Sequence, residues 1–291
     1  MYCKIQNEIN RAQEIGLKFE TFDIEKNKKV QYFVKTTLEN VALAEAIISN
    51  MSQYKKARDV NCVEKPKQET KSGSTAYWCS LLKEMKDKNI GEVESHNKEN
   101  LDENGHVKKF SYENLIENVV HSIDRENRTH QGVADGYNSV KDKIIQEAKN
   151  VSELINILSN EDDGFKFAWK IRHLKGRRPY SFSSKFCHYM ALYLLDGMQQ
   201  DFYPIYDYVV SGVVKEYIKL KLGYQMVDGK ELFVKNLDID CEDDTTYNPD
   251  EDVYLKYRNV IDNIISRNKL TKNGQDISRN GFDCLIWLTG K

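Results

Sequence analysis

One short stretch organises this sequence: FYPIYDYVV, residues 202–210. It places a single carboxylate, Asp207, between an extended Pro-Ile-Tyr segment and an apolar region. Asp is a favourable helix N-cap, and Pro204 biases Tyr203 toward an extended conformation. Downstream, apolar residues recur at helical spacing, at Val210, Val213, Val214, Tyr217 and Ile218. The sequence therefore predicts a helix that begins directly after Asp207, with this carboxylate held at the positive end of the helix dipole.

The region between Gly164 and Met190 is both basic and aromatic. It contains seven Lys and Arg residues and no acidic residue, in a chain whose net charge is −2. Cations that bind phosphates and flat rings that stack on bases occur together here, as in nucleic-acid-binding proteins. The ordinary alternative is a helix with a solvated basic face and an aromatic core face.

The remaining pattern predicts a mainly helical fold with small β-hairpin additions. Alternating residues from Leu17 to Val34 predict one hairpin, and residues 224–234 predict a second, which turns at Asp228-Gly229. Apolar stripes predict helices over about residues 41–51, 115–123, 140–158, 165–174, 184–195 and 260–265. The stretch from Glu84 to Lys109 is so polar that we expect a linker or long insertion. This divides the chain into an N-terminal region, residues 1–110, and a helical domain, residues 111–291.

The composition excludes several classes of protein. A hydrophobic content of 40% supports a buried core. No apolar run approaches the roughly 18 residues of a membrane helix, and the N-terminus lacks the apolar core of a signal peptide, so a cytoplasmic monomer without membrane contact is expected. The six cysteines form no Cys-x-x-Cys pair, and the acidic loop, residues 238–252, lacks the central Gly of a calcium loop. We therefore expect no metal and no cofactor.

Two segments resemble the helix-hairpin-helix DNA glycosylases. Residues 203–210, YPIYDYVV, are similar to the family's Phe-Pro-Ile-Leu-Asp-Gly-Asn-Val and Val-Pro-Val-Asp-x-His segments, whose Asp is catalytic. Residues 183–187, SSKFC, resemble the start of the second hairpin helix, where members with lyase activity carry Lys in a Gly-Val-Gly-x-Lys context. The two candidate residues, Lys185 and Asp207, are a few positions further apart than in the family, which fits a longer loop around residues 196–202. The resemblance covers residues 165–221.

The chain also departs from the family pattern. It has SFSS, residues 181–184, where the family's hairpin has Pro-Gly-Val-Gly, whose glycines let the backbone approach a DNA phosphate. Only Cys241 and Cys284 follow the Asp, so the cluster cysteines of the endonuclease III branch are missing. In place of the glycines, we expect side chains to contact the DNA phosphates: Arg172, Lys175, Arg177, Arg178, Ser183 and Ser184.

The resemblance implies an enzyme that flips a base out of double-stranded DNA and cleaves its N-glycosidic bond. Asp207 would stabilise the positive charge that builds on the sugar and orient a water. An uncharged Lys185 amine beside the sugar C1′ would form a Schiff base, which adds abasic-site lyase activity; a charged one would be a phosphate clamp or a plain surface lysine. Residues that would stack on the flipped base, although such residues more often fill a core, are Tyr206, Tyr203, Trp169 and His188.

The sequence leaves the substrate and one other function open. A damaged base would make the enzyme a DNA repair protein, whereas a modified base in foreign DNA would make it an antiviral defence factor. The main alternative is a non-catalytic DNA-binding protein that uses the same hairpin to hold phosphates. A structural helical protein is the third alternative.

Overall fold

The computed structural model describes the chain in separate ranges, and the account below is confined to them. These are residues 19–24, 29–34, 37–41, 44, 73–97, 101–127, 136–172, 180–195, 202–206, 226–227, 230–231, 252–267, 271–272, 275–276, 279, 281–283 and 286. They are mainly helical, with small two-stranded antiparallel sheets, as the sequence predicts. The chain forms two compact units. The helical unit contains Pro66–Tyr206 and Ile239–Leu255, and the second unit contains Met1–Lys65, Asp207–Asp238 and Lys256–Lys291.

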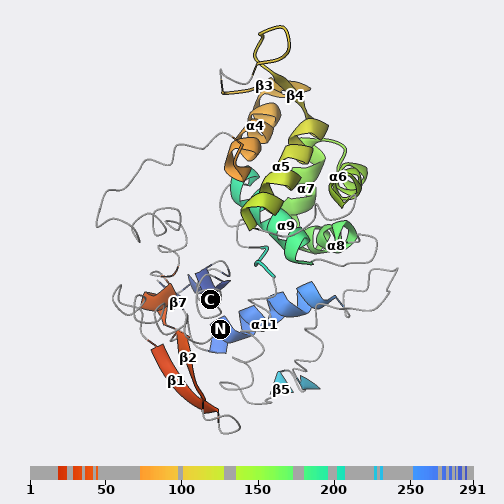
Figure 1. The fold of residues 1–291 in the computed structure, drawn as a ribbon. Coiled ribbons are helices and arrows are strands. Elements are labelled where there is room, and N and C mark those ends of the chain that lie inside the picture. Colours follow the sequence, from red (N-terminus) through yellow and green to blue (C-terminus); the bar gives the residue numbers. More distant parts are fainter. Residues whose placement is uncertain are drawn as a thin grey trace, which may run out of the picture. The chain divides into compact units, whose positions relative to one another are not determined.

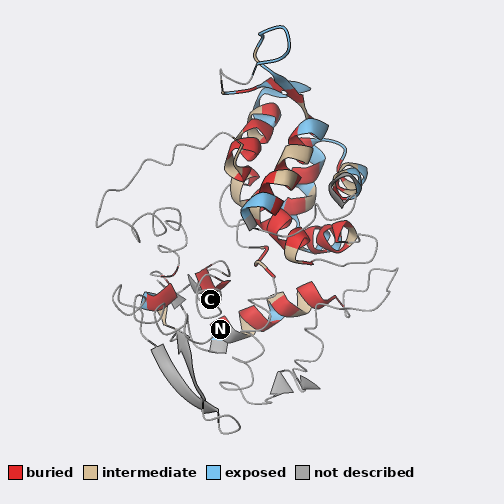
Figure 2. Cartoon of the chain, in the orientation of Figure 1, coloured by how far each residue is buried: buried red, intermediate tan, exposed pale blue. Residues whose placement is uncertain are grey.

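The helical unit is built around its last long helix, α9 (Tyr180–Leu194), which contacts four others. Those are α4 (Thr75–Lys88), α5 (Tyr112–Asn127), α7 (Val151–Ser159) and α8 (Glu161–Ile171), while α6 (Gly136–Glu147) packs on α5 and α8. Figure 1 shows these helices gathered together, and Figure 2 shows buried residues where they face one another. Most of α9 is buried on every side, as expected for a helix at the centre of a core.

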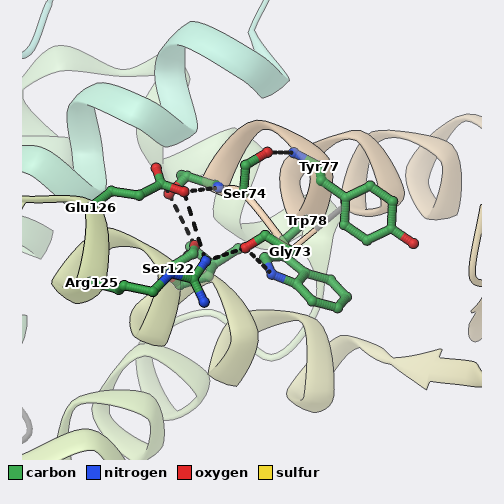
Figure 3. Close-up of polar contacts among 9 residues, drawn as sticks. Gly73, Ser74, Tyr77, Trp78, Ser122, Arg125 and Glu126 are labelled. Atoms are coloured by element: carbon green, nitrogen blue, oxygen red, sulfur yellow. Dashed lines mark hydrogen bonds and ion pairs between the residues drawn. The ribbon is translucent and has the colours of Figure 1, made fainter. Parts of the chain in front are cut away.

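The N-terminus of α4 is fixed to α5 by a polar network (Figure 3). Ser74 is the N-cap, and its hydroxyl accepts a hydrogen bond from the Tyr77 amide. The Glu126 carboxylate of α5 accepts from both the Thr75 amide (2.9 Å) and the Thr75 hydroxyl (2.8 Å). Arg125 donates to the Gly73 carbonyl. Two amides that the helix start leaves without intrahelical partners are therefore satisfied, that of Tyr77 by the Ser74 cap and that of Thr75 by Glu126 of the neighbouring helix.

The polar stretch that suggested a linker contributes to the fold instead. Helix α4 continues to Lys88, and strand β3 (Glu92–Glu94) pairs antiparallel with β4 (Lys109–Ser111), which leads directly into α5. The paired residues Val93 and Phe110 are 1% and 4% exposed, because they are the apolar positions of an otherwise polar region and face the core. The predicted boundary at residue 110 consequently falls inside β4. Residues 101–106, in the segment that connects β3 to β4, are exposed to solvent, as Figure 2 shows.

The single apolar stripe predicted over residues 140–158 is two helices, α6 and α7. The break comes from a cap: the Asn150 side chain accepts from the Glu153 amide (2.9 Å), and the Glu153 carboxylate accepts from the Lys149 amide (2.8 Å). Asn150 is therefore the N-cap of a new helix that starts at Val151, and Glu153 bonds back to the residue before the cap. The apolar stripe continues across the break, because residues on both sides of it are buried: Val140, Ile144, Ala148, Val151, Ile155 and Leu158.

Two helix starts differ from the prediction. Helix α8 begins at Glu161 rather than near Phe165, because Asn160 caps it and acidic residues occupy its first turn. Helix α9 begins at Tyr180 rather than at Ser184. The expectation that residues 181–184 replace the glycines of a hairpin is therefore wrong in its geometry, since these residues lie in the first turns of a helix. Residues 173–179, between α8 and α9, lie outside the described ranges.

The second unit contains both hairpins that the sequence predicts. Strands β1 (Phe19–Ile24) and β2 (Lys29–Val34) pair antiparallel, and β5 (Met226–Val227) pairs with β6 (Lys230–Glu231). A further pair, β7 (Thr271–Lys272) and β8 (Gln275–Asp276), was not predicted. Helix α11 (Val253–Arg267) contains the predicted stripe at residues 260–265. Of the helix predicted at 41–51, residues 41 and 44 are described and helical, as are residues 38–40 before it. The helix predicted after Asp207 lies outside the described residues. None of the helices in the described ranges combines the length and the apolar character needed to cross a membrane.

Candidate catalytic site at helix α9

Eight of the twelve predicted site residues are described by the structure. Seven of them lie on α8, on α9 or in the extended segment 203–206, and Arg172 follows α8 directly as its C-cap. The other four, Asp207, Lys175, Arg177 and Arg178, lie outside the described residues. The candidate site is therefore built from α9 and from the segment that leads into Asp207.

The extended segment 203–206 is held against α9 through its main chain. The Ser184 hydroxyl accepts from the Tyr206 amide (3.0 Å) and lies 3.2 Å from the Tyr206 carbonyl, to which it can donate. The same hydroxyl is 3.5 Å from the Ser181 carbonyl, so the contact with Tyr206 is the shorter one. A single buried side chain thus serves both polar main-chain groups of the residue that precedes Asp207.

A second contact lies one helical turn further along α9. Nδ1 of His188 is 2.9 Å from the Tyr203 carbonyl, and because a carbonyl only accepts, Nδ1 carries the proton. Burial lowers the pKa of His188, an effect that the hydrogen bond to Tyr203 partly opposes. The imidazole is therefore neutral at neutral pH, and its role here is to donate to the main chain.

The segment is also held from other parts of the helical unit. The Tyr254 hydroxyl donates to the Pro204 carbonyl (2.7 Å), and the Tyr203 hydroxyl donates to the Leu158 carbonyl at the end of α7 (2.9 Å). We call the three side chains that bind the main chain of residues 203–206 the segment anchor: Ser184, His188 and Tyr254.

Lys185 follows Ser184 on α9 and is only 7% exposed. Its Nζ lies 3.3 Å from the Ser181 hydroxyl, in the first turns of the helix. Consecutive residues of a helix point about 100° apart, so Lys185 and Ser184 occupy different faces of α9. The structure thus brings Lys185 and the main chain next to Asp207 to the same end of one helix.

Arg172 does not have the exposed guanidinium that a phosphate contact requires. It is 3% exposed, and its guanidinium lies over the rings of Trp169 (5.3 Å) and Tyr180 (4.5 Å). Among the residues that the structure describes, its Nε and Nη1 atoms find no hydrogen-bond partner. The expectation for Arg172 is corrected accordingly: it is a buried cation stacked between aromatic rings.

The other described candidates are also buried. The Ser183 hydroxyl faces the Tyr180 carbonyl of its own helix (3.4 Å), and the Tyr203 and Tyr206 rings, both 0% exposed, pack on Phe165 and Tyr180. Trp169 and His188 are 8% and 5% exposed. Stacking on a flipped base needs a free ring face, and phosphate contact needs an accessible hydroxyl. In this structure the rings fill the core, as such residues more often do, and Ser184 binds protein main chain.

The sequence analysis missed Asp252, Tyr254 and Tyr180. The Asp252 carboxylate accepts from the Tyr180 hydroxyl (2.8 Å) and from the Tyr254 amide (2.8 Å), and burial raises its pKa, against which the bond from Tyr180 is the largest opposing effect. Asp252 precedes α11 directly, and an Asp before an apolar periodic run is an N-cap signal that could have separated it from the acidic loop. No sequence signal places it beside Tyr180.

Within the described ranges, no group of three or more His, Cys, Asp or Glu residues is arranged to hold a metal ion. Comparison with known proteins found no matching family model, no matching curated protein and no matching solved structure.

Proposed function

We propose that this protein is a DNA glycosylase with a helix-hairpin-helix glycosylase-like fold, a cytoplasmic monomer that acts on double-stranded DNA. The observation that carries the proposal is the contact between Ser184 and Tyr206, at 3.0 and 3.2 Å. These residues immediately precede Lys185 and Asp207, the two residues that the family resemblance makes catalytic. The contact supports the proposal because it joins the two segments that carry the family resemblance.

Asp207 has the central role in the proposed reaction. When the bond between C1′ and the base nitrogen breaks, the base leaves with the electron pair and takes up a proton, and positive charge develops on the sugar. An ionised Asp207 stabilises that charge and orients the water that adds to C1′. The other product is an abasic site.

The first experiment measures base release from duplexes that contain normal, damaged or phage-type modified bases. The wild-type protein is expected to produce abasic sites in at least one modified duplex, and Asp207→Asn is expected to lose about 100-fold or more of the rate. Asp87→Asn, at an exposed carboxylate on α4, is the matched control and should retain the wild-type rate. Undiminished base release by Asp207→Asn would refute the assignment.

Lys185 adds a lyase step if its amine reacts. The amine nitrogen attacks C1′ as the base departs, the sugar ring opens, and a protonated Schiff base forms between lysine and DNA. Borohydride reduces this adduct and traps it. Trapping by wild type and by Lys149→Ala, an exposed lysine, but not by Lys185→Ala, is the expected result. Base release without a trapped adduct would show that the protein is a glycosylase without lyase activity.

The deep burial of Lys185 favours a second candidate, a non-catalytic DNA-binding protein, because a lysine that is 7% exposed, with its amine 3.3 Å from the Ser181 hydroxyl, has little access to a sugar. The two candidates differ at Asp207, since a carboxylate against DNA weakens a pure binder. Under the second candidate, Asp207→Asn binds DNA more tightly and no duplex loses a base.

A further inference from the structure

We propose that Asn104 is a site of spontaneous modification, at which the main chain converts the side-chain amide to aspartate and isoaspartate at a rate that Asp102 controls. The reacting pair is Asn104-Gly105, in the segment that connects β3 to β4. Both residues are exposed to solvent (Figure 2). The inference concerns the helical unit alone and does not depend on the proposed action on DNA.

The connecting segment ends in a tight hairpin that requires glycine at position 105. The Gly105 amide donates to the Asp102 carbonyl (3.0 Å), the Asp102 amide donates to the His106 carbonyl (2.7 Å), and Leu101 and Val107 form a β-bridge. Gly105 has a φ of +80°, which residues with a Cβ atom rarely adopt. A turn followed by a glycine in this conformation is a common three-residue hairpin loop. The backbone of the hairpin therefore selects glycine after Asn104.

The same glycine makes Asn104 reactive, because no side chain at position 105 shields the main-chain nitrogen. That nitrogen loses its proton to solvent and forms a bond to Cγ of Asn104. The bond between Cγ and the side-chain nitrogen breaks, and this nitrogen takes up a proton and leaves as ammonia. The product is a cyclic succinimide, which water opens at either carbonyl to give aspartate or isoaspartate. Both products add a negative charge, and isoaspartate also adds one methylene to the main chain.

Asp102 opposes this reaction, because it binds the amides of three successive residues. Its carbonyl accepts from Gly105, and its Oδ1 accepts from the amides of Asn104 (2.8 Å) and His106 (2.9 Å). An amide that donates a hydrogen bond gives up its proton only after the bond opens, as in amide hydrogen exchange. The hairpin therefore reacts only during the fraction of time in which its turn is open, and the Asp102 side chain lowers that fraction.

Peptide mapping by chromatography and mass spectrometry tests the site. The full-length protein and a synthetic peptide of residues 99–110 are incubated at neutral pH, and the rates of product formation at Asn104 are compared. The wild-type protein is expected to form both products, about tenfold or more slowly than the peptide. The map separates Asn104 from the other Asn-Gly pairs, residues 273–274 and 280–281. No product at Asn104, over a time in which the peptide reacts completely, overturns the proposal.

Two variants test the control by Asp102. Asp102→Ala removes the acceptor of two amides and is expected to raise the protein rate at least about threefold, when each protein is compared with the peptide that carries the same substitution. Glu103→Ala is the matched control, since this neighbouring carboxylate has no hydrogen bond or ion pair with the residues that the structure describes, and it should keep the wild-type ratio. Equal ratios in the two variants, or equal rates in the wild-type protein and its peptide, overturn the role of Asp102.

Discussion

At the scale of single residues, four buried polar side chains of the candidate site bind main chain or aromatic rings. Ser184, His188 and Tyr254 each contact a main-chain group of residues 203–206, and Arg172 stacks on two rings. The sequence analysis selected Ser184, His188 and Arg172 as site residues but predicted that they contact DNA. Composition shows which side chains are polar, and only the packing of α8, α9 and the extended segment shows what they bind.

The buried His188 predicts a pH dependence of stability. Its pKa is lowered in the folded protein, so below about pH 6.5 the unfolded chain takes up a proton that the folded chain does not. The contribution of His188 is therefore fully present above this pH and is lost progressively as the pH falls below it. Urea unfolding between pH 5 and 8 should show a shallower pH dependence for His188→Asn than for wild type, with the exposed His106→Asn as control. An unchanged slope in His188→Asn would contradict the account.

The position of Arg172 over two aromatic rings predicts that a positive charge alone does not maintain the stability of the protein at this site. Arg172→Lys keeps the cation but loses the planar group that lies over Trp169 and Tyr180, and it is expected to lower the free energy of unfolding by about 1–2 kcal/mol. Lys170→Arg, at a partly exposed neighbour, should change it by less than about 0.5 kcal/mol. Wild-type stability of Arg172→Lys would show that stacking contributes nothing.

At the scale of elements, apolar spacing predicted two hairpins and the described helices other than α4, which no predicted stripe covers. The ends of the helices depend on hydrogen bonds, which apolar spacing does not reveal. The Asn150 cap divides one predicted stripe into α6 and α7, and Asn160 starts α8 earlier than expected. The start of α9 at Tyr180 matters most for the site, because it moves residues 181–184 from a hairpin into a helix. The pairing of Val93 with Phe110 could not be predicted, because the charged residues around each made the stretch resemble a linker.

The packing of Tyr203 against α8 predicts that a Gly→Ala substitution in this helix lowers stability, although Ala has the higher helix propensity. Gly164 lies in α8, and a Cβ atom there would meet the Tyr203 hydroxyl at 1.8 Å. Ala normally stabilises a helix by about 1 kcal/mol over Gly, but here we expect Gly164→Ala to destabilise the protein by about 1–3 kcal/mol, because the ring cannot stay in place. Gly91→Ala, where nothing lies within 4 Å, is the control for chemical denaturation. A gain in stability for Gly164→Ala would mean that Tyr203 does not hold this position.

At the scale of the whole molecule, the sequence predicted a mainly helical protein with small hairpins, and the structure confirms this composition. The division into units was not predictable, because the helical unit combines Pro66–Tyr206 with Ile239–Leu255, residues distant in the chain. Short motifs marked residues 184–185 and the segment 203–206, which the structure brings into contact through Ser184 and Tyr206, while the roles of Lys185 and Asp207 stay predictions. Asp252 and Tyr254 belong to the segment Ile239–Leu255, and only the tertiary structure shows that they contact Tyr180 and Pro204.

Under the proposed function, the net charge of −2 predicts that DNA would be bound by a local basic region rather than by the molecule as a whole. Binding to an unmodified duplex should therefore weaken steeply between 50 and 200 mM salt. Fluorescence anisotropy across this range measures the slope. A binding constant independent of salt would argue against any phosphate contact.

The central claim is that Asp207 offsets positive charge on a sugar removed from the duplex. The most direct test is the affinity for two abasic-site analogues in the same duplex, a cationic pyrrolidine and a neutral tetrahydrofuran, because neither depends on which base the proposed reaction removes. Wild type is expected to bind the pyrrolidine duplex at least about tenfold more tightly, and Asp207→Asn to lose this preference. Equal affinities in the wild type, or a preference that survives in Asp207→Asn, would contradict the claim.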